Sequence, residues 1–183
     1  GGNSRQLAVG RIDDQAGLTL RDVRVGYAGQ QRPAIVALLD ERTALVDAAE
    51  SGALVLGVVR SLHAAEALVR LVEAFPDAER RRVRATLSSV LRAVLAQRLL
   101  ERADGKGQVA AFEVLLATSK VADCVAEDRL GDLPRLIADG EYHGMQTLDR
   151  GLELLARDAL AALRDAVAAA DDPEEVRLAL GRL

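Results

Sequence analysis

Apolar and polar positions along this 183-residue chain follow two different periods. Short continuous apolar runs, broken by Gly, Asp and Gln, are typical of strands, and they occur at residues 7–12, 18–25, 34–39 and 54–59. Helical spacing predicts a short helix over residues 44–49, a helix over residues 64–74 that ends at Phe75-Pro76, and a long helix from Asp77 to about residue 100. The long helix depends on one apolar stripe, which consists of Val83, Leu87, Val90, Leu91, Val94 and Leu95.

The second half of the chain differs from the first. A strand over residues 109–117 is the last one that the pattern predicts, and every later apolar repeat is helical. These helices are expected at residues 121–127, 133–138, 145–156 and 159–170, followed by a last helix that Asp172 caps and Pro173 opens. The prediction is therefore an α/β fold with a mostly parallel sheet over residues 1–117, followed by an all-helical subdomain over residues 118–183.

Composition narrows the possible functions. A net charge of −4 and a pI of about 5.3 argue against a nucleic-acid-binding protein. One cysteine and two histidines make a Cys- or His-rich metal site improbable, so no metal is expected. No apolar run approaches the roughly 18 residues of a membrane span, and the start shows no signal peptide. We expect a cytoplasmic protein without a transmembrane segment. Because the chain begins with Gly1-Gly2 rather than Met, a segment upstream is expected to be missing.

Residues 99–115 contain a Gly-Lys-Gly sequence that suggests a phosphate-binding loop. A P-loop needs a glycine five residues before its Gly-Lys pair and Ser or Thr after the lysine. Leu100 and Gly107 occupy those two positions, so both requirements fail. A glycine-rich turn of a β-hairpin, centred on Gly105-Lys106-Gly107, is the better interpretation.

The same stretch carries a family resemblance. The sequence RADGKGQVAAFE that ends at Glu113, together with Phe75-Pro76 and the GMQTLD sequence that ends at Asp149, resembles the type II/type IV secretion ATPase family. The twitching-motility, pilus-retraction (PilT-like) branch is the most similar, and the resemblance runs from about residue 48 to residue 183. It implies a partial RecA-like fold that corresponds to the C-terminal part of a motor domain. It also implies ring-shaped hexamers that bind ATP between subunits and extend or retract pili.

Nucleotide chemistry in this family uses four parts, and the first two are altered here. The P-loop is absent, and only Gly2-Asn3-Ser4 weakly resembles a remnant of it. The acidic box resembles Ile12-Asp13-Asp14, so the resemblance implies nucleotide-binding roles for Asp13 and Asp14. The alternative for this segment is a turn rich in Asp and Gln.

The other two parts are present in modified form. A strand that ends in Asp40-Glu41 resembles the Walker B strand, whose carboxylate organises Mg²⁺, although charged residues also end ordinary strands at solvent. The histidine-box position falls on Arg60 in an ungapped alignment, or on His63 in a gapped one. Arg70 and Arg84 fall at arginine positions of the family, which implies nucleotide contacts for both.

The altered parts lead to one leading hypothesis and one alternative. The leading hypothesis is a pseudo-ATPase that acts through protein contacts in pilus retraction or assembly, with no cofactor. Its partners would be further copies of itself, a pilus motor ATPase, or proteins of the pilus base at the inner face of the membrane. The alternative is the C-terminal fragment of an active hexameric ATPase, which would use ATP and Mg²⁺ with a P-loop upstream.

Overall fold

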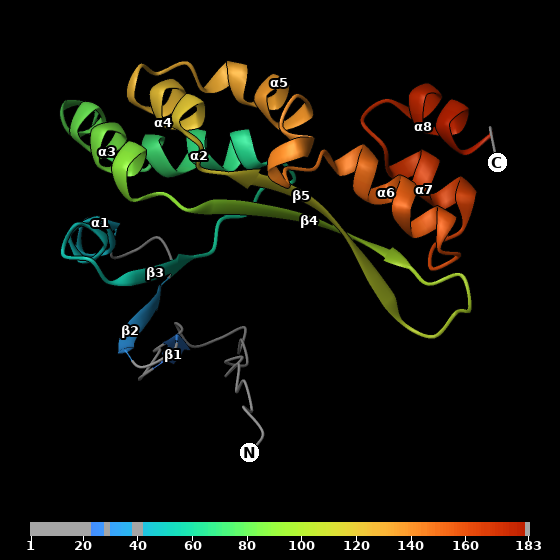
Figure 1. Cartoon of the computed structure of the whole chain (residues 1–183), viewed down its shortest axis with the longest axis horizontal. Coiled ribbons are helices and arrows are strands. Elements are labelled where there is room, and N and C mark those ends of the chain that lie inside the picture. The colour runs from blue at the N-terminus through green and yellow to red at the C-terminus, as the bar shows by residue number, and fades with distance from the viewer. Residues whose placement is uncertain (1–22, 28–29, 38–41, 182–183) are drawn as a thin grey trace.

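A computed structural model describes residues 23–27, 30–37 and 42–181, and side-chain surroundings are described from residue 46 onward. Five strands and ten helical segments are seen in these ranges (Figure 1). The strands are β1 (Val23–Tyr27), β2 (Gln30–Ala37), β3 (Leu54–Gly57), β4 (Ala93–Glu101) and β5 (Gln108–Leu116). The α-helices are α1 (Arg42–Glu50), α2 (Ala64–Glu73), α3 (Asp77–Val90), α4 (Ser119–Ala126), α5 (Leu133–Ala138), α6 (Leu148–Arg157), α7 (Leu163–Ala169) and α8 (Pro173–Leu180), and two 3₁₀ turns are η2 (Leu130–Asp132) and η3 (Glu141–His143).

The strands form two separate sheets within the described residues. The first has the order β1-β2-β3, where β1 and β2 are antiparallel and β2 and β3 are parallel. The second is the antiparallel hairpin β4-β5, which pairs Ala93 with Leu116 at one end and Glu101 with Gln108 at the other. The α/β class is confirmed. The expectation that most pairings are parallel does not hold for the described strands, because a hairpin turn joins β4 to β5 and forces them to run in opposite directions.

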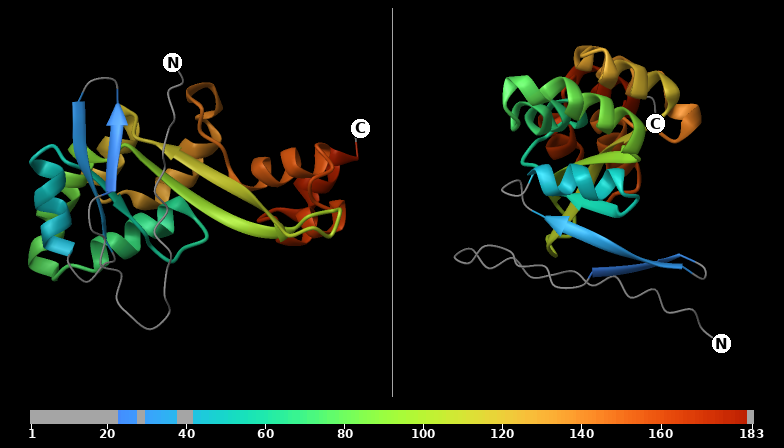
Figure 2. Two further views of the ribbon diagram at one scale, coloured as in Figure 1. Left: turned by 90° about the horizontal axis from the view of Figure 1, so that it is seen from below. Right: turned by 90° about the vertical axis from the view of Figure 1, so that its left-hand side faces the viewer.

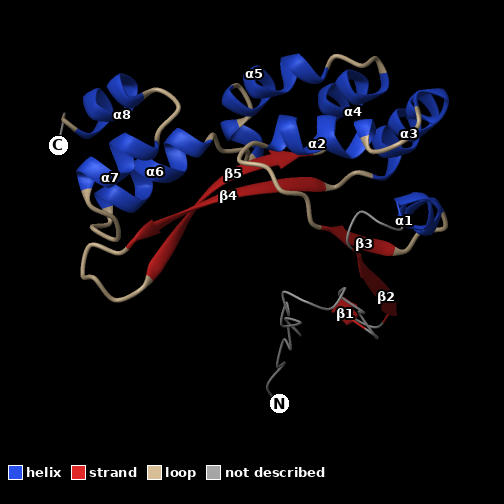
Figure 3. Ribbon diagram, turned by 180° about the vertical axis from the view of Figure 1, so that it is seen from behind, coloured by secondary structure: helices blue, strands red, loops and turns tan. Residues whose placement is uncertain are grey.

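The hairpin organises the larger part of the fold. It runs from the group formed by α2 to α5 toward the group formed by α6 to α8 (Figures 1 and 2). Helices α2 to α8 lie on one side of the hairpin, and the β1-β2-β3 sheet lies on the other together with α1 (Figure 3). One face of the hairpin is therefore covered by helices, and the other is not.

The structure corrects the predicted long helix. Helix α3 ends at Val90, and residues 93–101 form β4 instead. Helical spacing over this stretch was coincidental, because its burial alternates with the period of a strand: Ala96 and Leu100 are buried while Leu95 and Leu99 are exposed. The hydroxyl of Ser89 donates to the carbonyl of Thr86, a bond that competes with helix continuation just before the break.

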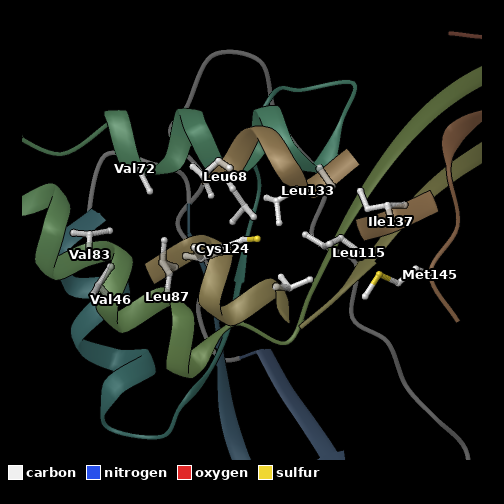
Figure 4. Packing of buried hydrophobic residues seen from close by; sticks show 14 of the residues in the cluster. Val46, Leu68, Val72, Val83, Leu87, Leu115, Cys124, Leu133, Ile137 and Met145 are labelled. Carbon is white, nitrogen blue, oxygen red and sulfur yellow. The ribbon is translucent and has the colours of Figure 1, made fainter. Parts of the chain in front are cut away.

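Two hydrophobic cores hold the helices to the hairpin. The larger core packs α2, α3, α4 and α5 around one end of β5, with Leu68, Leu115 and Leu133 almost fully buried (Figure 4). The smaller core joins α6 and α7 to the hairpin through Leu100 and Leu152. Both cores combine residues from either side of residue 117, and the division of the chain at 117/118 stays a prediction.

The predicted hairpin turn is confirmed. Gly105 and Gly107 have φ angles of 69° and 93°, a left-handed conformation that glycine adopts without strain. The Asp104 carboxylate accepts hydrogen bonds from the Lys106 N–H (3.0 Å) and from two guanidinium nitrogens of Arg102 (3.0 and 3.1 Å). The side-chain bond from Arg102 lowers the pKa of Asp104 below its usual value. The Gly-Lys-Gly sequence is therefore used for chain reversal.

Candidate functional site

A pocket of about 570 Å³ lies where the start of α2, strand β5, helices α5 and α6, and the loop before α8 meet. Its lining includes residues of two of the motifs that carry the family resemblance: Glu113 on β5, and Met145, Gln146, Thr147 and Asp149 before and at the start of α6. His63 lies at its edge, directly before α2. This pocket is the place where the motif residues come together, and we treat it as the candidate site.

Local bonds fix His63 at the start of α2. Its backbone is extended (φ −130°, ψ 146°), and its N–H donates to Ser61 Oγ over 3.2 Å. The same Ser61 oxygen lies 2.8 Å from Glu66 Oε2 in the first turns of the helix, and this contact lowers the pKa of Glu66. Glu66 in turn binds Arg70 at 2.6 Å one turn later. The chain therefore enters α2 in a single defined direction.

The carboxylate of Glu113, on strand β5, caps the N-terminus of helix α2. His63 makes no side-chain cap bond, and the Ala64 N–H donates instead to Glu113 Oε1 over 2.6 Å. The second oxygen of Glu113 lies 3.4 Å from His63 Nδ1. Glu113 is only 7% exposed, and the partial positive charge of the helix N-terminus stabilises a carboxylate there. This contact joins α2 to the middle of β5, 49 residues away in sequence.

His63 also reaches the C-terminal helices. Its Nε2 lies 3.5 Å from Asp171 Oδ1, in the loop between α7 and α8. Asp149 holds that loop in place, since its two oxygens accept the N–H groups of Asp171 (2.7 Å) and Asp172 (2.8 Å). Asp172 then caps α8 by accepting from the N–H groups of residues 174 and 175, and its predicted role as a cap is confirmed. A chain of contacts thus runs from α2 through the pocket to α8.

The pocket is strongly acidic. Six carboxylates line it, against one arginine and one histidine. Arg150 binds the nearly buried Glu153 at 2.9 Å and lies 3.8 Å from Glu141. The carboxylates are Glu113, Glu141, Asp149, Glu153, Asp171 and Glu175. In the described residues, no group of three or more His, Cys, Asp or Glu side chains is arranged to hold a metal ion.

The predicted site residues fall in different places. His63 lines the pocket, whereas Arg60 is an exposed residue in the loop after β3 and does not line it. Arg70 pairs with Glu66 on the outer side of α2. Arg84 on α3 contacts Asp128 at 3.3 Å, and its Nε is buried without a hydrogen-bond partner among the described residues. Four further predicted residues lie outside the described ranges: Asp13, Asp14, Asp40 and Glu41.

None of the six pocket carboxylates was predicted as a site residue, and three of them, Glu113, Asp149 and Asp171, form the contacts around His63. Glu113 carried a signal, because it is a carboxylate inside an apolar strand, and such a group is buried only with partners. Asp149 belongs to a recognised motif, but its partners are backbone groups 22 and 23 residues later. Nothing in the sequence around Asp171 indicated that it belongs to the site.

Comparison with known proteins finds similar sequences among twitching-motility and pilus-retraction proteins. No protein-family model matches the chain. The chain is 39% identical over 115 residues to a twitching motility protein of Neisseria gonorrhoeae, a match that covers 63% of this chain and 31% of the relative. It is 36% identical over 127 residues to the type IV pilus retraction ATPase PilT of Pseudomonas aeruginosa, covering 69% and 37% of the two chains. The chain thus spans about a third of the length of these curated relatives.

Solved structures give the same assignment. The pilus retraction motor PilT with bound ADP superimposes with a TM-score of 0.65 at 30% identity, over 81% of this chain and 42% of the motor. The ATPase DotB of Legionella pneumophila shares the fold, with a TM-score of 0.61 at 19% identity over 74% of this chain and 39% of DotB. The fold is therefore the one seen in part of the PilT and DotB ATPases. The chain is a homologue of the C-terminal part of the PilT-like twitching-motility ATPases, and the resemblance of its motifs is confirmed. No helix among the described residues has the length and apolar character needed to cross a membrane.

Proposed function

We propose that this chain is a pseudo-ATPase of the PilT-like group, which acts through protein contacts in pilus retraction or assembly and does not hydrolyse ATP by itself. The observation that carries the proposal is the sign of the charge in the pocket where the motif residues meet. Six carboxylates face one arginine there, and a field of that sign repels a polyphosphate.

Phosphoryl transfer depends on cations and backbone N–H groups that surround the phosphates. In the described residues the groups available do not fit that task. The Gly105-Lys106-Gly107 sequence forms the hairpin turn, and five of the six pocket carboxylates contact His63, Arg150 or backbone N–H groups of the fold itself. Across the whole sequence there is no GxxxxGK[ST] stretch.

Protein contacts are the function that remains for such a fold. The expected partners are further copies of this chain or a PilT-like motor, in an oligomer like those that the resemblance implies, with proteins of the pilus base as further candidates. We place this assembly in the cytoplasm, at the inner face of the membrane.

A second candidate function is favoured by the coverage of the relatives. Because the chain matches only 31–37% of the length of each, it also fits the C-terminal part of an active retraction ATPase. Asp40 and Glu41 would then organise Mg²⁺ beside an ATP phosphate bound by a P-loop encoded upstream.

Turnover measurements on the purified 183-residue chain test the proposal. We expect no Mg²⁺-dependent release of phosphate from ATP, for the chain and for an Asp40→Asn variant alike. Turnover that Asp40→Asn abolishes would refute the pseudo-ATPase proposal.

The contact role needs a second measurement, with purified PilT of Pseudomonas aeruginosa as the partner. We expect the chain to change the ATP turnover of this motor in a concentration-dependent way, and a bovine serum albumin control to leave it unchanged. Absence of both binding and effect would contradict a contact role with such a motor. If a longer product of the same gene, with a P-loop upstream, released phosphate from ATP while the 183-residue chain did not, the second candidate function would be established instead.

A further inference from the structure

The imidazole of His63 lies between two carboxylates that come from distant parts of the chain. Its Nδ1 lies 3.4 Å from Glu113 Oε2 on β5, and its Nε2 lies 3.5 Å from Asp171 Oδ1 in the loop between α7 and α8. The His63 side chain is 34% exposed, so the ring exchanges protons with water. Both nitrogens of one histidine therefore face an acceptor, and each acceptor belongs to a different segment.

This arrangement connects two groups of helices that have separate hydrophobic cores. The larger core includes α2 to α5, whereas the smaller core holds α6 and α7 to the hairpin (Figure 1). His63 directly precedes α2, and Asp171 lies two residues before α8. The contact between them crosses from one group to the other. A change in this contact therefore alters how firmly the loop before α8 is held to α2.

The number of bonds that the ring donates depends on its charge. A neutral imidazole carries one N–H and donates to only one carboxylate, and its other nitrogen then turns a lone pair toward a carboxylate oxygen. The imidazolium carries an N–H on each nitrogen and donates to Glu113 and Asp171 together. Charge-assisted bonds of this kind are about 2.7–2.9 Å long. Both observed separations are longer, so the contact has room to tighten when the ring gains a proton.

The other charged groups around the ring act in the same direction. Those that line the pocket are Glu141, Asp149, Arg150, Glu153 and Glu175. Arg150 is already paired with Glu153 at 2.9 Å, and on α2 itself Glu66 is paired with Arg70 at 2.6 Å. The charged ring of His63 therefore meets an excess of negative charge from β5, α6, α8 and the loop before α8, and the one arginine of the pocket is neutralised locally.

We propose that His63 is a pH-dependent latch between α2 and the loop before α8, closed when its imidazole is protonated and loosened when the ring is neutral. The latch reaches α8 because Asp149 holds the loop through the N–H groups of Asp171 and Asp172, and Asp172 caps the helix. The imidazolium makes its second bond only in the folded chain. The stabilisation is therefore present on the acidic side and is lost as the pH rises through the usual range of an imidazole, about pH 6.5. This device does not depend on whether the chain hydrolyses ATP.

Urea unfolding of the whole chain at about pH 6 and about pH 8 tests the latch, with His63→Gln as the variant. The quantity compared is the unfolding equilibrium constant of the variant divided by that of the unmodified chain. We expect this ratio to be about threefold larger at the lower pH, a size typical of partly exposed ion pairs. His143→Gln is the matched control, because His143 is exposed and its ring contacts Tyr142 rather than a carboxylate. Its ratio should be the same at both pH values.

A second variant tests the role of Asp171. Asp171→Asn keeps an oxygen at this position and removes the negative charge, so the threefold effect of His63→Gln should fall to about 1.5-fold or less in this background. NMR of the unmodified chain supplies a measurement that needs no variant to fold. The amide resonances of Asp171 and Asp172 should shift over the same pH range as the ring protons of His63.

Three results would overturn the proposal. The first is a ratio for His63→Gln that does not change with pH. The second is an undiminished effect of His63→Gln in the Asp171→Asn background, which would assign the pH dependence to Glu113 alone. The third is a set of loop amides whose resonances do not follow the titration of the His63 ring.

Discussion

Removal of the Glu113 carboxylate is expected to destabilise the fold. This carboxylate accepts the N–H of Ala64, which is fully buried, and it does so at the N-terminus of α2. In Glu113→Ala that N–H loses its acceptor. A buried unsatisfied donor costs about 1–3 kcal/mol, and loss of a helix cap costs about 1 kcal/mol. Both figures describe the same bond, so they do not add.

We therefore expect Glu113→Ala to lower the free energy of unfolding by about 2–3 kcal/mol, at the upper end because the donor has no access to water. Glu113→Gln keeps a carbonyl oxygen at the position of the acceptor and should cost about 1 kcal/mol or less. Urea unfolding followed by circular dichroism measures both values. Glu101→Ala, an exposed glutamate in the same hairpin, is the control and should change stability by less than about 0.5 kcal/mol.

Two results would refute this reasoning. If Glu113→Ala were as stable as the control, the bond to Ala64 would not hold α2. If Glu113→Gln were as destabilised as Glu113→Ala, the negative charge rather than the hydrogen bond would be the stabilising feature.

Further predictions concern close packing and pH. A Cβ added at Gly151 of α6 would lie 2.7 Å from the Phe112 carbonyl oxygen of β5, so Gly151→Ala should destabilise the fold by about 1–3 kcal/mol in the same urea assay, whereas Gly131→Ala, with nothing within 4 Å, should not. Equal stability of the two variants would contradict the close approach of α6 to β5. Because Arg102 lowers the pKa of Asp104, the bonds of the hairpin turn should persist above the unfolded value of about 3.9 and be lost as the pH falls through the lower folded value. Amide resonances of the turn, followed by NMR between pH 6 and about pH 2, should therefore change with a midpoint below about 3.9, and a midpoint above it would be inconsistent with the ion pair.

Local sequence signals predicted the elements whose causes are local. Helix α2 was predicted over residues 64–74 and observed over Ala64–Glu73, and the glycine turn and the Asp172 cap were both found where expected. The error at Val90 arose because apolar residues spaced for a helix also fit an alternating strand. Tertiary packing decided between the two, since Leu100 of β4 packs into the core with α6 and α7.

The candidate site was only partly predictable, because it depends on contacts between distant segments. The sequence left Arg60 and His63 as alternatives for one motif position, and nothing near them indicated a partner on β5. The pairing of His63 with Glu113 and Asp171 joins segments 50 and 108 residues apart. Such pairings arise because the hairpin places α2 beside the α7–α8 loop. The spacing of residues along the chain does not predict that arrangement.

The positions of the motif residues are compatible with the proposed loss of ATP hydrolysis. Gly105 and Gly107 reverse the chain, Glu113 caps α2, Thr147 caps α6, and Asp149 holds the loop before α8. Each of these roles stabilises the fold, and none of them involves a phosphate. The residues to which the resemblance assigns Mg²⁺ and the acidic box are different ones, in another part of the chain. Loss of hydrolysis and retention of the recognisable motifs are therefore compatible in one protein, because the two depend on different residues.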